Sequence, residues 1–185
     1  MQSVSGGPAR QLTKGEAEGV LLDWSPDGKE IAYVSLSNGP TDVWKVPAAG
    51  GPATMLAGEP TFEETDPMWS RDGRWIYFRS NRSGRGEFWR VSPTGWVPEV
   101  VLAPVGVAPT LSRDGLAVCS IFPANPPNQR TLWSRSLEFK SGRAHTAFSG
   151  KRGFIHSNAL TTDDKFLYFT WEEGASDVWV MDVAR

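Results

Sequence analysis

The phrase Trp-Ser-Pro-Asp-Gly at residues 24–28 decides the fold, because it returns three times along the chain. It recurs as Trp-Ser-Arg-Asp-Gly at 69–73, as Leu-Ser-Arg-Asp-Gly at 111–115 and, in a weaker form, as Leu-Thr-Thr-Asp-Asp at 160–164. The shared aspartates are 45, 42 and 49 residues apart. A nearly fixed period of this length indicates an architecture built from one small structural unit repeated along the chain.

A second phrase follows each copy of the first and keeps the same period. It consists of a hydrophobic residue and a tryptophan, at residues 43–44, 88–89, 132–133 and 178–179. These tryptophans lie 45, 44 and 46 residues apart. Because two independent markers share one period, we interpret the chain as four copies of one unit.

Each unit is predicted to contain four antiparallel strands. The Asp-Gly pair suits a tight turn, in which glycine accepts a positive φ without steric cost. The second strand is β-branched and aromatic, as in Ile-Ala-Tyr-Val at 31–34 and Ile-Tyr-Phe at 76–78. No segment shows helical periodicity. The fold class is therefore all-β, with four four-stranded antiparallel sheets that pack on one another through the repeated tryptophans.

The stretches Trp-Ser-Pro-Asp-Gly-Lys-Glu-Ile-Ala-Tyr (24–33) and Asp-Val-Trp-Lys-Val (42–46) resemble the WD-like repeat of the TolB β-propeller family. The resemblance covers almost the whole chain and is weakest in the third unit, where Leu111 replaces tryptophan. It implies a β-propeller of four blades and, by family, a bacterial protein outside the cytoplasm. Residues 1–6 contain no signal-peptide pattern, so the sequence leaves the location open. Similar repeats also form propellers in prolyl-oligopeptidase-like peptidases, so the resemblance implies a fold rather than one activity.

We expect one propeller domain over residues 1–185, with blades at about 18–57, 65–103, 108–149 and 156–185 plus 8–13. The last assignment comes from Gly-Gly-Pro-Ala-Arg-Gln-Leu at 6–12, which aligns without gaps on Gly-Gly-Pro-Ala-Thr-Met-Leu at 50–56. An N-terminal strand would then complete the last blade and remove two exposed edges. Three arrangements stay open: a closed four-bladed ring, part of a larger propeller, or a homodimer formed by strand exchange.

Composition and motifs exclude several function classes. A net charge of −2 argues against nucleic-acid binding, and no apolar run is long enough for membrane insertion. The single cysteine, Cys119, excludes an internal disulfide. No Gly-x-Ser-x-Gly, His-Glu-x-x-His or phosphate-binding Gly-Lys-Ser/Thr motif is present. We therefore expect no catalytic residue, no cofactor and no bound metal.

The variable loops between second and third strands, together with the blade connections, are the predicted binding side of the scaffold. From them we take the following residues as candidates for contact with a partner: Glu18, Glu64, Asp66, Arg82, Arg85 and His156. The arginines suit acidic or phosphate groups. The acidic residues would suit a cation in the channel, although carboxylates in such positions are more often simply solvated.

These observations favour a non-catalytic scaffold that binds a protein or peptide partner on its loop face. Two alternatives stay open. The chain could be the substrate-access propeller of a larger prolyl-oligopeptidase-like hydrolase, or a carbohydrate-binding or lyase propeller with a metal in its channel.

Overall fold

The computed structural model describes residues 8–13, 20–36, 39–95, 97–124, 129–147, 154–163, 165–172 and 176–182. Two compact units share the chain, the first within residues 1–78 and 91–98 and the second within 79–90 and 99–185. The described part of the chain contains no helix long and apolar enough to span a membrane.

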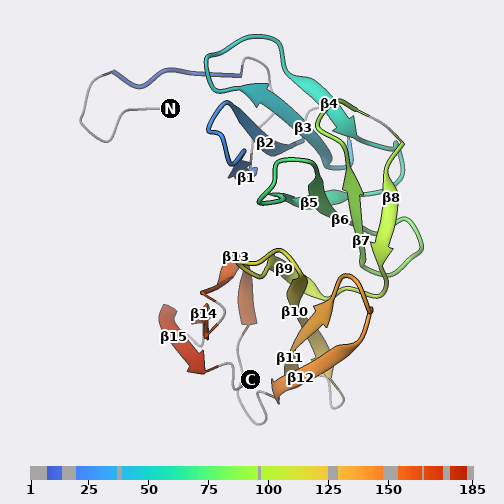
Figure 1. Cartoon of the computed structure of the whole chain (residues 1–185), viewed down its shortest axis with the longest axis vertical. Coiled ribbons are helices and arrows are strands. Elements are labelled where there is room, and N and C mark those ends of the chain that lie inside the picture. Colours follow the sequence, from blue (N-terminus) through green and yellow to red (C-terminus); the bar gives the residue numbers. More distant parts are fainter. Residues whose placement is uncertain are drawn as a thin grey trace. The chain divides into compact units, whose positions relative to one another are not determined.

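The structure confirms the predicted all-β fold of antiparallel sheets (Figure 1). The first sheet contains β1 (Val20–Trp24), β2 (Glu30–Ser35), β3 (Asp42–Pro47) and β4 (Thr54–Ala57), in that order. The second contains β5 (Glu64–Trp69), β6 (Ile76–Ser80), β7 (Glu87–Val91) and β8 (Glu99–Leu102). The third contains β9 (Val107–Leu111), β10 (Ala117–Ala124), β11 (Gln129–Ser136) and β12 (Gly142–Ala147). Within the described residues, the fourth contains three strands, β13 (Phe154–Thr162), β14 (Phe166–Glu172) and β15 (Ser176–Asp182).

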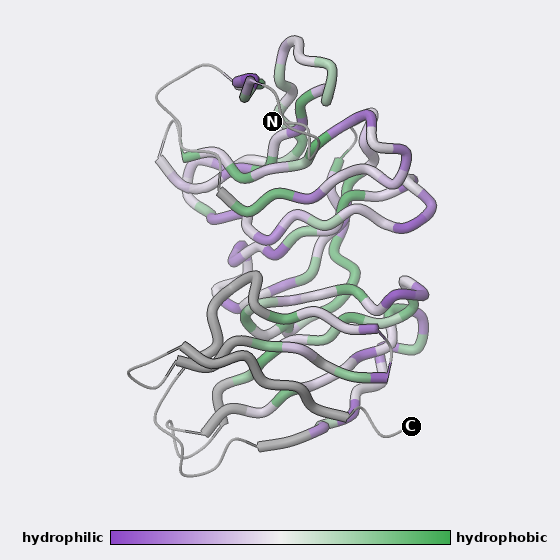
Figure 2. The backbone as a smooth tube through the Cα atoms, turned by 90° about the vertical axis from the view of Figure 1, so that its left-hand side faces the viewer, coloured by the Kyte–Doolittle hydropathy of each residue, from purple (hydrophilic) through white to green (hydrophobic). Residues whose placement is uncertain are grey.

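Neighbouring strands in each sheet follow one another along the chain, so each sheet is a series of consecutive hairpins. Along the strands, alternate side chains enter the core. The fully buried side chains include Val34, Val43, Ile76 and Phe78 in the first unit and Phe88, Leu102, Ile121 and Leu132 in the second. Figure 2 shows hydrophobic segments along the extended runs of the backbone and hydrophilic segments at many of its bends.

Residues 8–13 do not form the strand that the sequence predicts for them. They lie instead against the first sheet, where the Arg10 guanidinium donates hydrogen bonds to the carbonyl oxygens of Ala48 and Ala49. The matching copy at 50–56 does enter a strand, because Thr54 and Met55 of β4 pair with β3. Ring closure, strand exchange and the single-domain assignment stay predictions.

The Ser-x-Asp-Gly turn has the same hydrogen bonds in the first three sheets. In the first, the Ser25 hydroxyl donates to Asp27 Oδ1 at 2.7 Å and accepts from the Glu30 amide at 2.9 Å. Gly28 has a φ of 70°, which confirms the predicted role of glycine here. The pairs Ser70–Asp72 and Ser112–Asp114 repeat this geometry. In the fourth turn, Asp164 lies outside the described residues, and Asp163 accepts directly from the Phe166 amide.

These turns make the stability of the fold depend on pH. The hydrogen bond from Ser70, assisted by bonds from Arg74, lowers the pKa of Asp72 from 3.8 to about 2. Serine and backbone donors likewise lower the pKa of Asp27 and of Asp114. A carboxylate whose pKa is lower in the folded chain stabilises it above the unfolded pKa and loses that effect as pH falls.

We therefore predict that the melting temperature falls between about pH 4 and pH 2, and that Asp72→Asn flattens this dependence. Circular dichroism melts across this pH range measure both slopes. The matched control is Glu59→Gln, which changes an exposed carboxylate outside these turns. Equal slopes for Asp72→Asn and the unchanged chain would contradict this origin of the acid sensitivity.

A residue with a positive φ recurs before the turn in each of the first three sheets, and the sequence motif gives no sign of it. Leu21, Asp66 and Ala108 have φ values of 53°, 54° and 49°, and each lies three residues before the turn phrase of its unit. Strand pairing shifts register near this point in the first and third sheets, so Leu21 and Ala108 lie at β-bulges. A left-handed conformation costs a residue other than glycine roughly 1–2 kcal/mol.

In the third sheet, the backbone beside the bulge is packed tightly. The amide of Gly106 donates to the buried Ser120 hydroxyl at 3.3 Å. A Cβ on Gly106 would clash with the carbonyl group of Ile121. The hydroxyl residue in the second strand thus accepts a hydrogen bond from the segment that leads into the first strand.

Two glycines of this sheet are expected to respond differently to alanine. Gly106→Ala must displace backbone atoms, so we predict a loss of about 3 kcal/mol or more in the free energy of unfolding. Gly115→Ala meets no atom within 4 Å but has a φ of 73°, so the expected loss is about 1–2 kcal/mol. Urea denaturation measures both, with the exposed neighbour Leu116→Ala as the near-neutral control. A Gly106→Ala effect no larger than that of Gly115→Ala would contradict the close approach.

Sheets within each unit meet through their first strands. β5 packs against β1, β2 and β3 in the first unit, and β9 packs against β13 in the second. A side chain hydrogen-bonds across the first of these junctions: Asp23 Oδ2 of β1 accepts from the Trp69 amide of β5 at 2.7 Å. Burial raises the pKa of Asp23 despite this bond and a second one from the Trp24 amide.

The Asp23 bond can be tested with a pair of substitutions. Asp23→Ala leaves the Trp69 amide without its acceptor, which should cost about 1–3 kcal/mol of unfolding free energy. Asp23→Asn keeps a carbonyl oxygen that can accept the same hydrogen, so it should lose less than half as much. Thermal and urea unfolding of both variants provide the comparison. Equal losses would show that the acceptor oxygen does not matter.

The tryptophan markers have varied surroundings in the described residues. Trp133 packs edge-to-face on Phe122 of the neighbouring strand, with ring centroids 6.3 Å apart. Trp89 carries an arginine over its ring. The side chain of Trp179 lies outside the described residues. Packing between blades through these residues stays a prediction.

Candidate binding surface

Two of the predicted site residues, Arg82 and Arg85, share the turn between β6 and β7, residues 81–86. The Gly84 amide donates to the Asn81 carbonyl at 2.8 Å, and Gly84 has a φ of 77°, so the loop is a tight turn. The Arg82 amide donates to the Ser80 hydroxyl at the end of β6, at 3.4 Å. The chain thus holds Arg82 close to the strand and leaves Arg85 exposed.

Arg82 stacks on an aromatic ring. Its Cζ lies 4.8 Å from the centroid of Trp89, a cation–π geometry that restricts the orientation of the arginine. The Trp89 indole N–H in turn donates to Glu87 Oε2 at 3.0 Å. The second marker tryptophan therefore supports a charged side chain at the surface.

The base of the turn is fixed to the connection that follows β8. The Val105 amide donates to the Gly86 carbonyl at 2.7 Å. A Cβ on Gly86 would come within 2.5 Å of the Val105 carbonyl oxygen and 2.9 Å of Arg79 Nε. Only glycine allows this approach, so the turn is presented from a closely packed base.

Glu64 and Asp66 do not lie in an exposed connection, where the sequence places them. Both belong to β5, with 0% and 9% of their surface exposed. The Glu64 amide donates to the Thr41 carbonyl at 2.8 Å, and Asp66 accepts a hydrogen bond from the Thr65 hydroxyl. β5 packs against the first sheet, and both residues are buried there.

Two predicted site residues lie outside the described part of the structure. Glu18 is in a segment that is not described. The backbone of His156 belongs to β13, but its side chain is not described. Of the six candidates, the structure places Arg82 and Arg85 together on one turn, and Glu64 and Asp66 together on one strand. A partner-binding role for any of them stays a prediction.

A serine–histidine pair occurs on neighbouring strands of the third sheet. His145 Nε2 lies 2.7 Å from Ser134 Oγ, and burial lowers the pKa of His145, with Arg143 adding to the effect. Nucleophilic catalysis further requires a third group that orients the base and donors for an oxyanion. We interpret the pair as a structural hydrogen bond between β11 and β12. Within the described residues, no cluster of histidine, cysteine, aspartate and glutamate has the form of a metal site.

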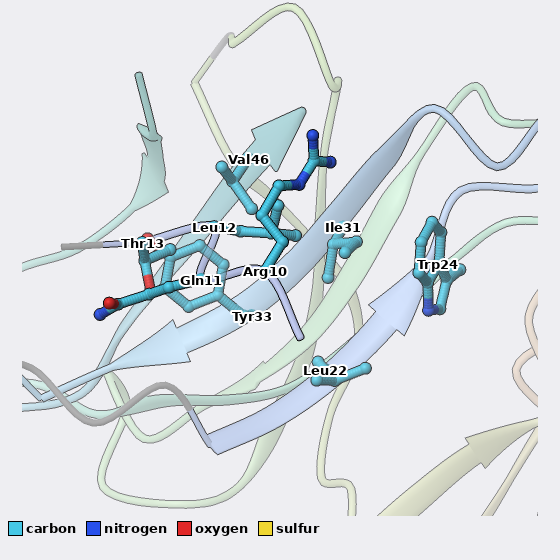
Figure 3. Close-up of a pocket in the computed structure, with 9 residues that line it drawn as sticks. All are labelled: Arg10, Gln11, Leu12, Thr13, Leu22, Trp24, Ile31, Tyr33 and Val46. Atoms are coloured by element: carbon cyan, nitrogen blue, oxygen red, sulfur yellow. The ribbon is translucent and has the colours of Figure 1, made fainter. Parts of the chain in front are cut away.

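Sequence reasoning missed an apolar cavity of about 300 Å³ on the first sheet (Figure 3). One wall is made by side chains of β1, β2 and β3, and the other by residues 10–13. The wall from the sheet consists of Leu22, Trp24, Ile31, Tyr33 and Val46. The alternation of apolar and polar residues along β1 and β2 could have identified the apolar face of the sheet from the sequence. The position of residues 10–13 against that face depends on tertiary contacts and could not.

Comparison with known proteins identifies the fold. No protein-family model matches the chain. The structure of TolB from Acinetobacter baumannii superposes with a TM-score of 0.76 over 98% of this chain and 45% of that chain, at 17% sequence identity. The fold is that of a TolB-like β-propeller domain. The structure of a putative TolB from Agrobacterium tumefaciens also superposes on this chain. The TM-score is 0.64 and the sequence identity 25%, over 77% of this chain and 54% of that chain.

The TolB-like fold is shared with peptidase propellers. A puromycin-hydrolyzing peptidase from Mycobacterium tuberculosis superposes with a TM-score of 0.69 at 15% identity, over 94% of this chain and 28% of the peptidase. In sequence, the uncharacterized protein Atu1656 of Agrobacterium fabrum is 37% identical over 92 residues. That match covers 49% of this chain and 30% of the relative, so the chain spans less than two thirds of the proteins that it matches.

Proposed function

We propose that this TolB-like domain is a non-catalytic scaffold that binds a protein or peptide, with acidic groups of the partner facing the β6–β7 turn. The observation that carries the proposal is the arginine held over Trp89, on a turn whose base admits only glycine. A cation that is already ordered loses little side-chain entropy when it binds a carboxylate. Arg85, which directly follows Gly84 in the turn, adds a second positive charge at an exposed position.

A random peptide library panned against the protein tests the proposal. We predict that the enriched peptides are acidic, and that Arg82→Glu combined with Arg85→Glu weakens their binding at least tenfold, because attraction becomes repulsion. The charge-matched control combines Arg143→Glu with Lys165→Glu, at two exposed positions away from the turn. Peptides that bind both double variants equally well would contradict a role for the β6–β7 turn.

A second candidate function is supported by the similarity to the peptidase from Mycobacterium tuberculosis. On this hypothesis, the domain is the substrate-access propeller of a larger hydrolase. The match covers 28% of the peptidase, so its hydrolytic activity is not carried over by the fold. The full-length coding sequence tests this candidate: a Gly-x-Ser-x-Gly hydrolase domain in the same protein would support it, and a different neighbouring domain would contradict it.

A further inference from the structure

Arg79 of β6 occupies a place that apolar residues occupy in the sheets on either side along the chain. In each of the first three sheets, the serine of the first turn accepts a hydrogen bond from an amide near the start of the second strand. Four residues after that amide stand Val34 in the first sheet, Arg79 in the second and Ile121 in the third. Val34 and Ile121 are both 0% exposed. One charged side chain therefore stands where the fold otherwise places its core.

The guanidinium group of Arg79 fits because residue 86 is a glycine. A Cβ on Gly86 would come within 2.9 Å of Arg79 Nε and 3.0 Å of Arg79 Nη2. It would also come within 2.5 Å of the Val105 carbonyl oxygen. These three residues all belong to the second unit, so the arrangement is a property of that unit alone. The chain thus combines an arginine in β6 with the glycine that makes room for it.

Arg79 has a charge that the described residues do not neutralise. Its Nε is buried and has no hydrogen-bond partner among them. The ion pairs within the described part of the chain join other side chains. Arg79 is half-buried, so water solvates its charge only in part, and a charge removed from water costs free energy unless it is paired. A group that binds to the arginine explains its presence better than packing does, because valine or isoleucine would pack here at lower cost.

We propose that Arg79 is the anchor of an oxyanion site, which takes a carboxylate or phosphate group. The planar guanidinium of arginine presents its donors in a fork that matches the oxygens of both groups. A hydrogen bond between charged groups is also stronger in partly buried surroundings than on the open surface. The oxyanion is either a free small anion or an acidic group of a bound partner, and the two arms of the test distinguish these sources.

This site differs from the turn on which the proposed function rests. Arg82 stacks on Trp89, whereas Arg79 lies beside Gly86. Because side chains alternate along a strand, positions 86 and 89 face opposite sides of the β6–β7 hairpin. The inference therefore does not depend on Arg82 or Arg85, and the two proposals can fail separately.

The first arm of the test measures the melting temperature of the full chain in inorganic phosphate or acetate against chloride at equal ionic strength. An anion at about ten times its Kd should raise the melting temperature by about 3 °C or more. Arg79→Ile, which introduces the residue type of the third sheet, should abolish this shift without lowering the melting temperature in chloride. Arg79→Gln, which keeps a polar side chain without the charge, should abolish the shift as well. The control Arg143→Ile removes an exposed positive charge from the same unit and should keep the shift.

The second arm uses acidic peptides selected on the unchanged chain, and isothermal titration calorimetry measures their affinity. If the oxyanion belongs to a partner, Arg79→Ile should weaken peptide binding at least tenfold although Arg82 and Arg85 are intact. Loss of the phosphate or acetate shift alone assigns the site to a free anion. Loss of peptide affinity assigns it to an acidic group of the partner.

Two results would overturn the inference. In the first, Arg79→Ile and Arg79→Gln change neither the anion shift nor the peptide affinity. In the second, Arg79→Ile lowers the melting temperature in chloride, which would show that the arginine serves the fold. Peptides that bind regardless of Arg82 and Arg85 would instead contradict the proposed function, and the phosphate and acetate result at Arg79 would stand.

Discussion

One serine hydroxyl fixes the first turn in each of the first three sheets. The hydroxyl donates a hydrogen bond to the aspartate two residues later and accepts one from the backbone amide five residues later. This turn sets the register between the first and second strands. A shift by one residue would move every side chain of a strand to the other face of its sheet. The position of Asp23 at the sheet junction follows from that register, and so do the positions of Leu22 and Trp24 in the wall of the cavity on the first sheet.

Backbone strain accompanies the turn in each of these three sheets. Leu21, Asp66 and Ala108 adopt the left-handed conformation although none is glycine. The surrounding ladder holds them there, at a cost that the fold offsets through burial. In the third sheet, the Ser120 hydroxyl accepts a hydrogen bond from the Gly106 amide beside the bulge, which explains a hydroxyl residue at this point of the second strand.

The two copies of the Gly-Gly-Pro-Ala phrase show how context decides structure. Residues 54–57 become β4 because the edge of β3 is available to them. Residues 10–13 meet a sheet whose edge β4 already occupies, so they lie on its face and contact it through side chains. The same local preference for a strand therefore has two outcomes, and one of them creates the cavity on the first sheet.

The sequence by itself determined the repeat, the all-β class, the antiparallel sheets and the glycine turns, because strand period and turn chemistry are local properties. Tertiary structure alone decided that Glu64 and Asp66 are buried in β5, that Arg82 stacks on Trp89, and that residues 10–13 line the cavity on the first sheet. Those features depend on which groups meet across strands and sheets. The spacing of residues along the sequence does not encode such contacts, because they form only when packing selects one strand register and one face of the sheet.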